Sequence, residues 1–181
     1  MNSKLQDFRP DGGKIRFTNT PDGFKLRYGV WNTGAIGTIF FLNGRTEYIE
    51  KYSDTISKFL KRQFSVVSLD WRSQGLSQRY FGRRDIGHIN DYKEYQTDLK
   101  TLMSLEEIKK LPKPFVLVSH SMGGLIGLRA ISNKNHCFSA AIFSAPAWGA
   151  KMFENAVLNL IKGLAPVIKT PGISKIKLYP G

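Results

Sequence analysis

The sequence is poor in cysteine and has no long apolar run, and each scarcity excludes a class of protein. A single cysteine, Cys137, allows no internal disulfide, which indicates a reducing compartment rather than a disulfide-bonded secreted scaffold. No run of about 18 apolar residues occurs, so no segment is predicted to span a membrane. Residues 1–7 lack the apolar stretch of a secretory signal. We therefore expect a cytoplasmic protein.

Acidic residues are also scarce: 14 Asp and Glu stand against 27 Lys and Arg, for a formal net charge of +13. Such a charge attracts nucleic acid or the anionic surface of a membrane. The basic residues are scattered, which leaves general surface charge and peripheral contact with an anionic membrane surface as open interpretations. Nucleic acid is not an expected partner, because the chain has no nucleic-acid-binding motif and no stripe of aromatic and basic residues.

Apolar runs alternate with helical periodicities along most of the chain. The first two runs flank a turn, NTPDG, which predicts a hairpin. The later runs lack polar alternation, as expected for parallel strands covered by helices on both faces. The sequence therefore predicts an α/β fold with a mostly parallel sheet and an N-terminal antiparallel hairpin. We predict strands at 14–18, 24–31, 37–42, 64–69, 115–119 and 138–143, and helices at 48–62, 91–111, 122–132 and 151–169.

A serine lies where a predicted strand meets a predicted helix. The segment 119–123 reads SHSMG, close to the G-x-S-x-G form of a nucleophile elbow. Such a turn lifts the hydroxyl of Ser121 clear of the sheet and directs the backbone N–H of Met122 toward a developing oxyanion. Ser121 is therefore the candidate nucleophile and Met122 a candidate oxyanion donor. The alternative is an exposed serine on an ordinary strand–helix turn.

The loop after the third predicted strand is the usual source of a second oxyanion donor in such folds. Here the loop is 43–47, NGRTE. The backbone N–H of Arg45 is the candidate, with Gly44 permitting the tight turn. A plain connection between strand and helix is the alternative.

Five segments resemble, in order, the lysophospholipase and monoacylglycerol lipase group, also called serine aminopeptidase-like α/β-hydrolases. They are NGRTEYIEKY (43–52), DWRSQGLS (70–77), GHINDY (87–92), SHSMGG (119–124) and SAP (144–146). The resemblance implies the α/β-hydrolase fold and hydrolysis of a lipid or other acyl ester, with no cofactor and no metal. It also implies that Ser121 is the nucleophile and that Met122 and Arg45 are backbone oxyanion donors.

The chain departs from the group at three motif positions. Ser119 replaces the first glycine of the elbow, Asn43 replaces a histidine common in these lipases, and Ser73 replaces a glycine. The serine at 119 is small enough to fit the turn. The serine at 73 predicts a differently shaped loop.

The triad base and its orienting acid are not found in the expected order. After Ser121 the only acid is Glu154 and the only histidine is His136, whereas the fold requires the acid before the histidine. We expect His136 to be a solvated loop residue, His120 to pack within the elbow, and His88 to have a structural role. The resemblance implies that the missing acid and histidine follow a cap, on two further strands.

This interpretation divides the chain into a hydrolase core, 1–147, and the beginning of a cap, 148–181. A truncated chain would leave strand 138–143 at an edge of the sheet, and an unpaired apolar edge favours self-association. Two functional hypotheses remain open: a serine hydrolase impaired by the missing triad members, and a non-catalytic remnant or binding module.

Overall fold

An antiparallel hairpin begins the fold in the computed structural model, which describes residues 10–147. Its strands are β1 (Lys14–Asn19) and β2 (Lys25–Trp31), paired from Lys14 with Val30 to Asn19 with Lys25. In the turn, the Thr20 hydroxyl accepts a hydrogen bond from the backbone N–H of Phe24 at 2.8 Å. The predicted hairpin is confirmed.

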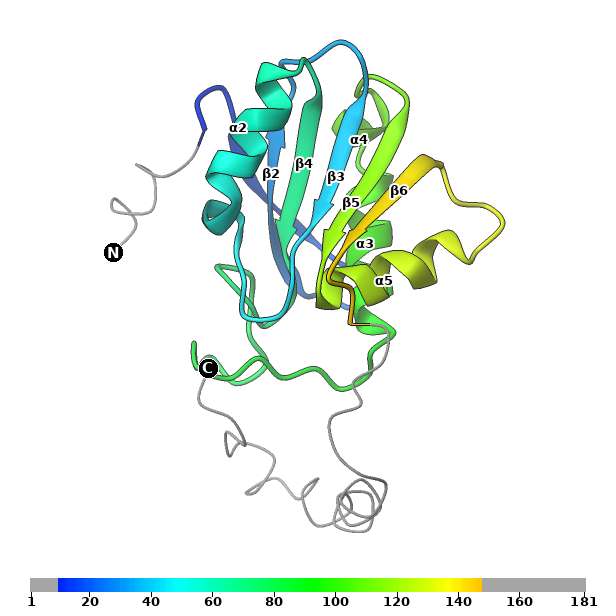
Figure 1. The fold of residues 1–181 in the computed structure, drawn as a ribbon. Helices are drawn as coiled ribbons and strands as arrows, with labels where there is room; N and C mark the ends of the chain where they lie inside the picture. Colours follow the sequence, from blue (N-terminus) through cyan, green and yellow to red (C-terminus); the bar gives the residue numbers. More distant parts are fainter. Residues whose placement is uncertain (1–9, 148–181) are drawn as a thin grey trace. The chain divides into compact units, whose positions relative to one another are not determined.

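The hairpin continues into a six-stranded sheet of order β1-β2-β4-β3-β5-β6 (Figure 1). β2 pairs antiparallel with β4, whereas β4, β3, β5 and β6 are parallel to one another. The central strand β3 is buried along its whole length, which explains why its sequence, TIFFL, shows no polar alternation. The predicted α/β class is confirmed. The bounds are β3 (Thr38–Leu42), β4 (Ser65–Asp70), β5 (Phe115–His120) and β6 (Phe138–Ser144).

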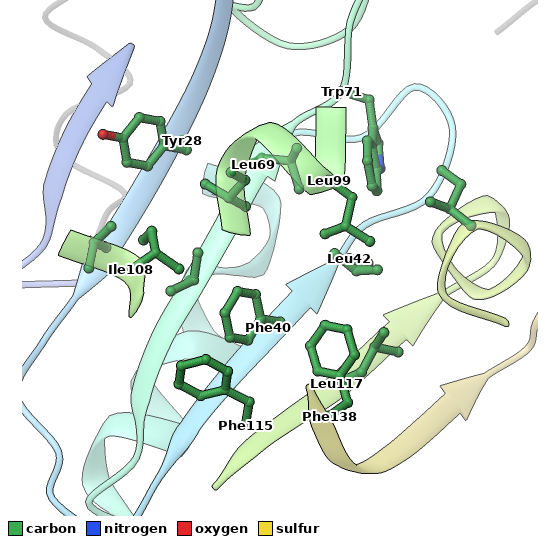
Figure 2. Close-up of a cluster of buried hydrophobic side chains, with 14 of the residues drawn as sticks. Tyr28, Phe40, Leu42, Leu69, Trp71, Leu99, Ile108, Phe115, Leu117 and Phe138 are labelled. Carbon is green, nitrogen blue, oxygen red and sulfur yellow. The ribbon is translucent and has the colours of Figure 1, made fainter. Parts of the chain in front are cut away.

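Side chains of β3 alternate between two apolar clusters, one on each face of the sheet. Phe40 and Leu42 belong to the cluster that includes residues of α3 (Glu94–Ser104), α4 (Glu106–Lys109) and α5 (Met122–Ile131). Figure 2 shows this cluster, in which the ring centroid of Phe40 lies 5.1 Å from that of Phe115 and 5.4 Å from that of Phe138. Ile39 and Phe41 belong to the opposite cluster, with Ile56 of α2 (Ser53–Lys61).

Two of the predicted helices are interrupted. The predicted helix 48–62 consists of the 3₁₀ helix η1 (Ile49–Tyr52) followed by α2. The predicted helix 91–111 is divided into α3 and α4 by Leu105, whose φ of −65° and ψ of 132° are extended rather than helical. Apolar spacing alone did not reveal these breaks, since both halves keep their apolar residues toward the same face of the sheet. The predicted helix 151–169 and the cap 148–181 lie outside the described residues.

The carboxyl ends of β3, β4 and β5 lie at one edge of the sheet, because these strands are parallel (Figure 1). The loops that follow them therefore meet there. We call this end of the sheet, at which the parallel strands terminate, the carboxyl edge; it is not the same as the outer strands β1 and β6. β6 is the last strand of the sheet in residues 10–147, as the sequence predicted for 138–143. In the same residues, no helix has the length and apolarity needed to cross a bilayer.

Candidate active site

Ser121 has the strained backbone of a nucleophile elbow. It lies between β5 and α5 with φ of 49° and ψ of −118°, a conformation that side-chain-bearing residues rarely adopt. Its N–H donates to the carbonyl of Ser144 at 3.1 Å, and its carbonyl accepts from the N–H of Gly124 at 2.9 Å and of Ala147 at 3.1 Å. These bonds hold the strained turn between two strand ends. Ser121 is half-buried at the carboxyl edge.

Two glycines after Ser121 allow α5 to begin against the sheet. A Cβ on Gly123 would lie 2.2 Å from the carbonyl oxygen of Leu42, and one on Gly124 would lie 2.7 Å from the Cβ of Pro146. Both separations are far below van der Waals contact, so only glycine permits this packing. The two glycines of the elbow motif are therefore needed for the close packing of α5 against the neighbouring strand ends.

Loop 43–47 lies directly against the elbow. A Cβ on Gly44 would be 3.1 Å from the Cβ of Ser121. The N–H of Gly44 donates to Oε2 of Glu47 at 2.5 Å, and the N–H of Thr46 donates to Oε1 of Gln74 at 2.5 Å. Arg45, between them, is exposed. The structure therefore brings the loop of Arg45 together with Ser121 and the adjacent Met122. The catalytic roles of these three residues stay a prediction.

Asp70 anchors the loops of the carboxyl edge. Its buried carboxylate accepts hydrogen bonds from the N–H of Ile49 at 2.9 Å and of Leu76 at 2.8 Å, and from the guanidinium of Arg27 at 2.9 Å. Arg27 also pairs with the buried carboxylate of Glu50. Burial raises the pKa of Asp70, against the opposing effect of Arg27. One carboxylate thus ties the start of η1, the loop after β4 and strand β2 together.

Glu47 is another buried carboxylate at this edge, and it lies beside the elbow. It accepts from the hydroxyl of Tyr52 and the ammonium of Lys51, each at 2.6 Å. Burial raises the pKa of Glu47, but the hydrogen bonds from Lys51, Tyr52 and the Gly44 N–H outweigh burial and hold this pKa below its usual value. Glu47 is therefore ionised at neutral pH.

The three histidines lie in different places. The Nε2 atom of His120 is 3.9 Å from Oε1 of Glu47. The Nε2 atom of His88 is 3.0 Å from Oδ1 of Asn90. His136 is exposed and precedes β6, at the amino ends of the parallel strands, away from the elbow. Within residues 10–147, none of the three forms a hydrogen bond with Ser121.

The three positions at which the chain departs from the group's motifs differ in how well their side chains fit the structure. Ser73 has φ of 60°, a value that favours the glycine it replaces, and its buried Oγ has no hydrogen-bond partner in the described part of the chain. The buried carboxamide of Asn43 likewise lacks partners among those residues. Ser119 fits the elbow, with its Oγ donating to the carbonyl of Ile142 at 3.3 Å. These two buried polar groups without partners each reduce the free energy of unfolding.

Sequence reasoning missed several side chains that shape this site. Glu47 and Gln74 accept backbone N–H groups of loop 43–47, and Trp71 donates from Nε1 to the carbonyl of Asn43 at 2.9 Å. All three lie inside segments that resemble the lipase group. These hydrogen bonds could not be predicted from the sequence, because the distance between donor and acceptor depends on how the loops pack against one another.

A strained serine turn after a central parallel strand, with a glycine-containing loop packed beside it, defines an α/β-hydrolase core. The comparison with family models agrees. The model described as Hydrolase_4, serine aminopeptidase, S33, matches residues 34–178. The chain therefore belongs to this serine aminopeptidase family.

Curated relatives are similar over part of their length. The probable lysophospholipase L2 of Haemophilus influenzae is 30% identical over 113 residues, which cover 61% of this chain and 35% of the relative. The monoacylglycerol lipase of Mycolicibacterium smegmatis is 27% identical over 161 residues, which cover 88% of this chain and 52% of the relative. The chain thus spans about half or less of the length of these relatives.

Solved structures show the same fold. A soluble variant of monoglyceride lipase from Saccharomyces cerevisiae, in complex with a substrate analog, has a TM-score of 0.66 at 19% identity, covering 88% of this chain and 53% of that one. A carboxyl esterase from Bacillus coagulans has a TM-score of 0.65 at 20% identity, covering 88% and 52%. At these identities the likeness supports the fold alone.

Proposed function

We propose that this chain is the core of a serine hydrolase of the lysophospholipase and monoacylglycerol lipase type, which cleaves carboxylic esters of lipids. The observation that carries the proposal is the strained φ of 49° at Ser121, beside a loop whose Gly44 lies against the serine side chain. The names of the relatives support an acyl-ester substrate.

In the proposed reaction, the Oγ of Ser121 attacks the ester carbonyl carbon and loses its proton to a base. The carbonyl oxygen becomes an oxyanion, which accepts hydrogen bonds from the backbone N–H groups of Met122 and Arg45. Collapse of this intermediate breaks the bond to the alcohol, which takes up the proton, and leaves an acyl ester on Ser121. Water then attacks the acyl carbon and gives its proton to the base, the bond from this carbon to Oγ of Ser121 breaks, and Oγ takes up the proton as the acid leaves.

The proposal assigns the base to none of the three histidines. His120 faces Glu47, His88 contacts Asn90, and His136 precedes β6. We propose that a histidine and its acid come from outside these 181 residues, as the resemblance implies. Turnover by this chain alone is then orders of magnitude below that of a complete triad.

Labelling with a fluorophosphonate tests the role of Ser121, because the strained turn and the oxyanion donors still favour attack by this hydroxyl when the triad base is absent. We expect slow, time-dependent labelling, located at Ser121 by peptide mass spectrometry, and none in Ser121→Ala. Ser119→Ala is the matched control, since it removes a neighbouring hydroxyl and should keep the label. If the unaltered chain and Ser121→Ala remain equally unlabelled, the proposal is wrong.

Hydrolysis of p-nitrophenyl butyrate distinguishes the proposal from the alternative, a non-catalytic relative that keeps the fold. Slow turnover that disappears in Ser121→Ala supports the hydrolase. Background hydrolysis that is identical in both chains, together with absent labelling, favours the binding module.

A further inference from the structure

Loop 43–47 presents three successive backbone N–H groups with different partners. The first, of Gly44, donates to Glu47, and the third, of Thr46, donates to Gln74. The N–H between them, of Arg45, has no acceptor among residues 10–147. The two bonded groups thus fix the peptides on either side of one unused donor, in the loop that adjoins Ser121.

The conformation of the loop needs this support. Thr46 has φ of 60°, and a β-branched residue is strained in that region. The N–H of this residue is the one that Gln74 accepts, at 2.5 Å. Without that acceptor, Thr46 can relax toward negative φ, and the neighbouring peptide groups turn with it. The bond to Gln74 therefore compensates strain at the residue that follows the unused donor.

Gln74 is itself held in place by buried groups. Only 3% of Gln74 is exposed, and its Nε2 donates to the hydroxyl of Tyr95 at 3.3 Å. The ring of Tyr95 packs edge-on against Trp71, with centroids 5.5 Å apart, and Trp71 donates to the carbonyl of Asn43 at the start of the same loop. The loop after β4 thus contacts loop 43–47 at two points.

Glu47 holds the other side. It is 6% exposed, and besides the Gly44 N–H it accepts from Tyr52, whose ring packs on Phe41 with centroids 4.4 Å apart. The carboxylate therefore has a fixed direction, set by the core beneath it.

We propose that Gln74 and Glu47 are positioning residues that clamp loop 43–47 on both sides of Arg45, so that its N–H is held ready for the oxyanion of the acyl substrate. This inference rests on the proposed function. Neither side chain touches the substrate; each acts through a backbone N–H of the loop. Preorganised donors are effective because they need no rearrangement when charge develops in the transition state.

Substitutions at Gln74 test the clamp with a matched control. Gln74→Met keeps the length of the side chain and removes the acceptor, whereas Gln74→Glu keeps an oxygen for the Thr46 N–H. Gln78→Met is the control: Gln78 belongs to the same loop and accepts the N–H of Lys25 at 2.9 Å, on the hairpin. The control thus loses the same kind of bond at a place away from loop 43–47.

Two measurements are made on each variant: amide hydrogen exchange of Thr46 by NMR, and the limiting rate of fluorophosphonate labelling at Ser121. In Gln74→Met we expect faster exchange at Thr46 and a labelling rate lower by about tenfold, less than the loss of a whole oxyanion donor. Gln74→Glu should restore both values to within about threefold, and Gln78→Met should leave both unchanged.

The outcomes separate this inference from the proposed function. If the unaltered chain labels at Ser121 and Gln74→Met labels equally fast, or keeps slow exchange at Thr46, the clamp is overturned while the hydrolase stands. If Gln78→Met slows labelling as much as Gln74→Met, the effect is general destabilisation and the clamp is again overturned. An unaltered chain that never labels overturns the proposed function, and the clamp then has no role in catalysis.

Discussion

At the scale of single residues, backbone strain is concentrated at the carboxyl edge. Of the five non-glycine residues with positive φ in residues 10–147, four follow the carboxyl end of a parallel strand: Thr46, Ser73, Ser121 and Ala145. Each such conformation costs about 1–3 kcal/mol and persists only where surrounding contacts enforce it. This distribution supports the location of the site, because strain of this kind collects where function requires a particular geometry.

Gly123→Ala should be strongly destabilising. Its Cβ would lie 2.2 Å from the Leu42 carbonyl oxygen, a backbone atom that cannot move away by a rotamer change. We expect the free energy of unfolding, measured by urea denaturation, to fall by about 2–3 kcal/mol. Gly87→Ala is the control, because its Cβ would meet only the Ser73 carbonyl, at 3.8 Å, and should change stability by less than about 0.5 kcal/mol. Equal effects in the two variants would contradict the packing described for the elbow.

Glu47 should make stability depend on pH in the acid range. Its pKa in the folded chain is below the ordinary value of 4.5, so the unfolded chain binds a proton at Glu47 more readily than the folded chain does. Its contribution to the free energy of unfolding is therefore complete above pH 4.5 and is lost as the pH falls through the lower, folded-state pKa. Glu47→Gln, compared by denaturation at pH 6 and pH 3.5, should lose less stability than the unaltered chain. An identical loss in both chains would assign the acid sensitivity to other carboxylates.

At the scale of elements, the parallel strands place the loops that follow them next to one another. β3, β4 and β5 each deliver one component of the site: loop 43–47, the loop of Trp71 and Gln74, and the elbow at Ser121. The outermost strand, β6, is different. Its Ile142 is 57% exposed, and its outer edge is unpaired within the described residues.

We propose that this chain self-associates through β6, because an apolar edge strand that has no further strand beside it among residues 10–147 can pair with another chain. Ile142→Lys should weaken the association by about tenfold, since it places an unpaired charge in the contact. Sedimentation velocity over a range of concentrations measures the effect. Ile36→Lys is the matched control, because Ile36 is 49% exposed in a loop outside the strands. A chain that remains monomeric at high concentration, or an equal effect of the two substitutions, would rule out the edge as the cause.

At the scale of the whole molecule, the net charge of +13 is the dominant feature. A positive field of this size attracts anionic surfaces irrespective of the fold. Lipid substrates are presented at such surfaces, so the charge fits the proposed substrate class. We therefore propose peripheral contact with anionic membranes as a property of the molecule rather than of one patch.

Cosedimentation with lipid vesicles tests this contact. We expect binding to vesicles that contain phosphatidylserine at 0.1 M salt and its loss at 1 M, since the screening length falls from about 10 Å to about 3 Å. Vesicles of neutral phosphatidylcholine are the control and should bind little at either concentration. Binding that is independent of salt, or equal for both vesicles, would show that charge is not responsible.

The sequence by itself determined the order of strands and helices, the α/β class and the elbow at Ser121, because these depend on short-range signals: apolar runs, turn residues and glycines at fixed offsets. It also placed Arg45 in the loop beside Ser121. Only the tertiary structure decided that Leu105 interrupts a helix, that Thr46 is strained, and that Gln74 and Glu47 accept the N–H groups on either side of Arg45. The reason is physical: Gln74 meets Thr46 across 28 residues of chain because two parallel strands end at one edge, and no local pattern encodes that meeting.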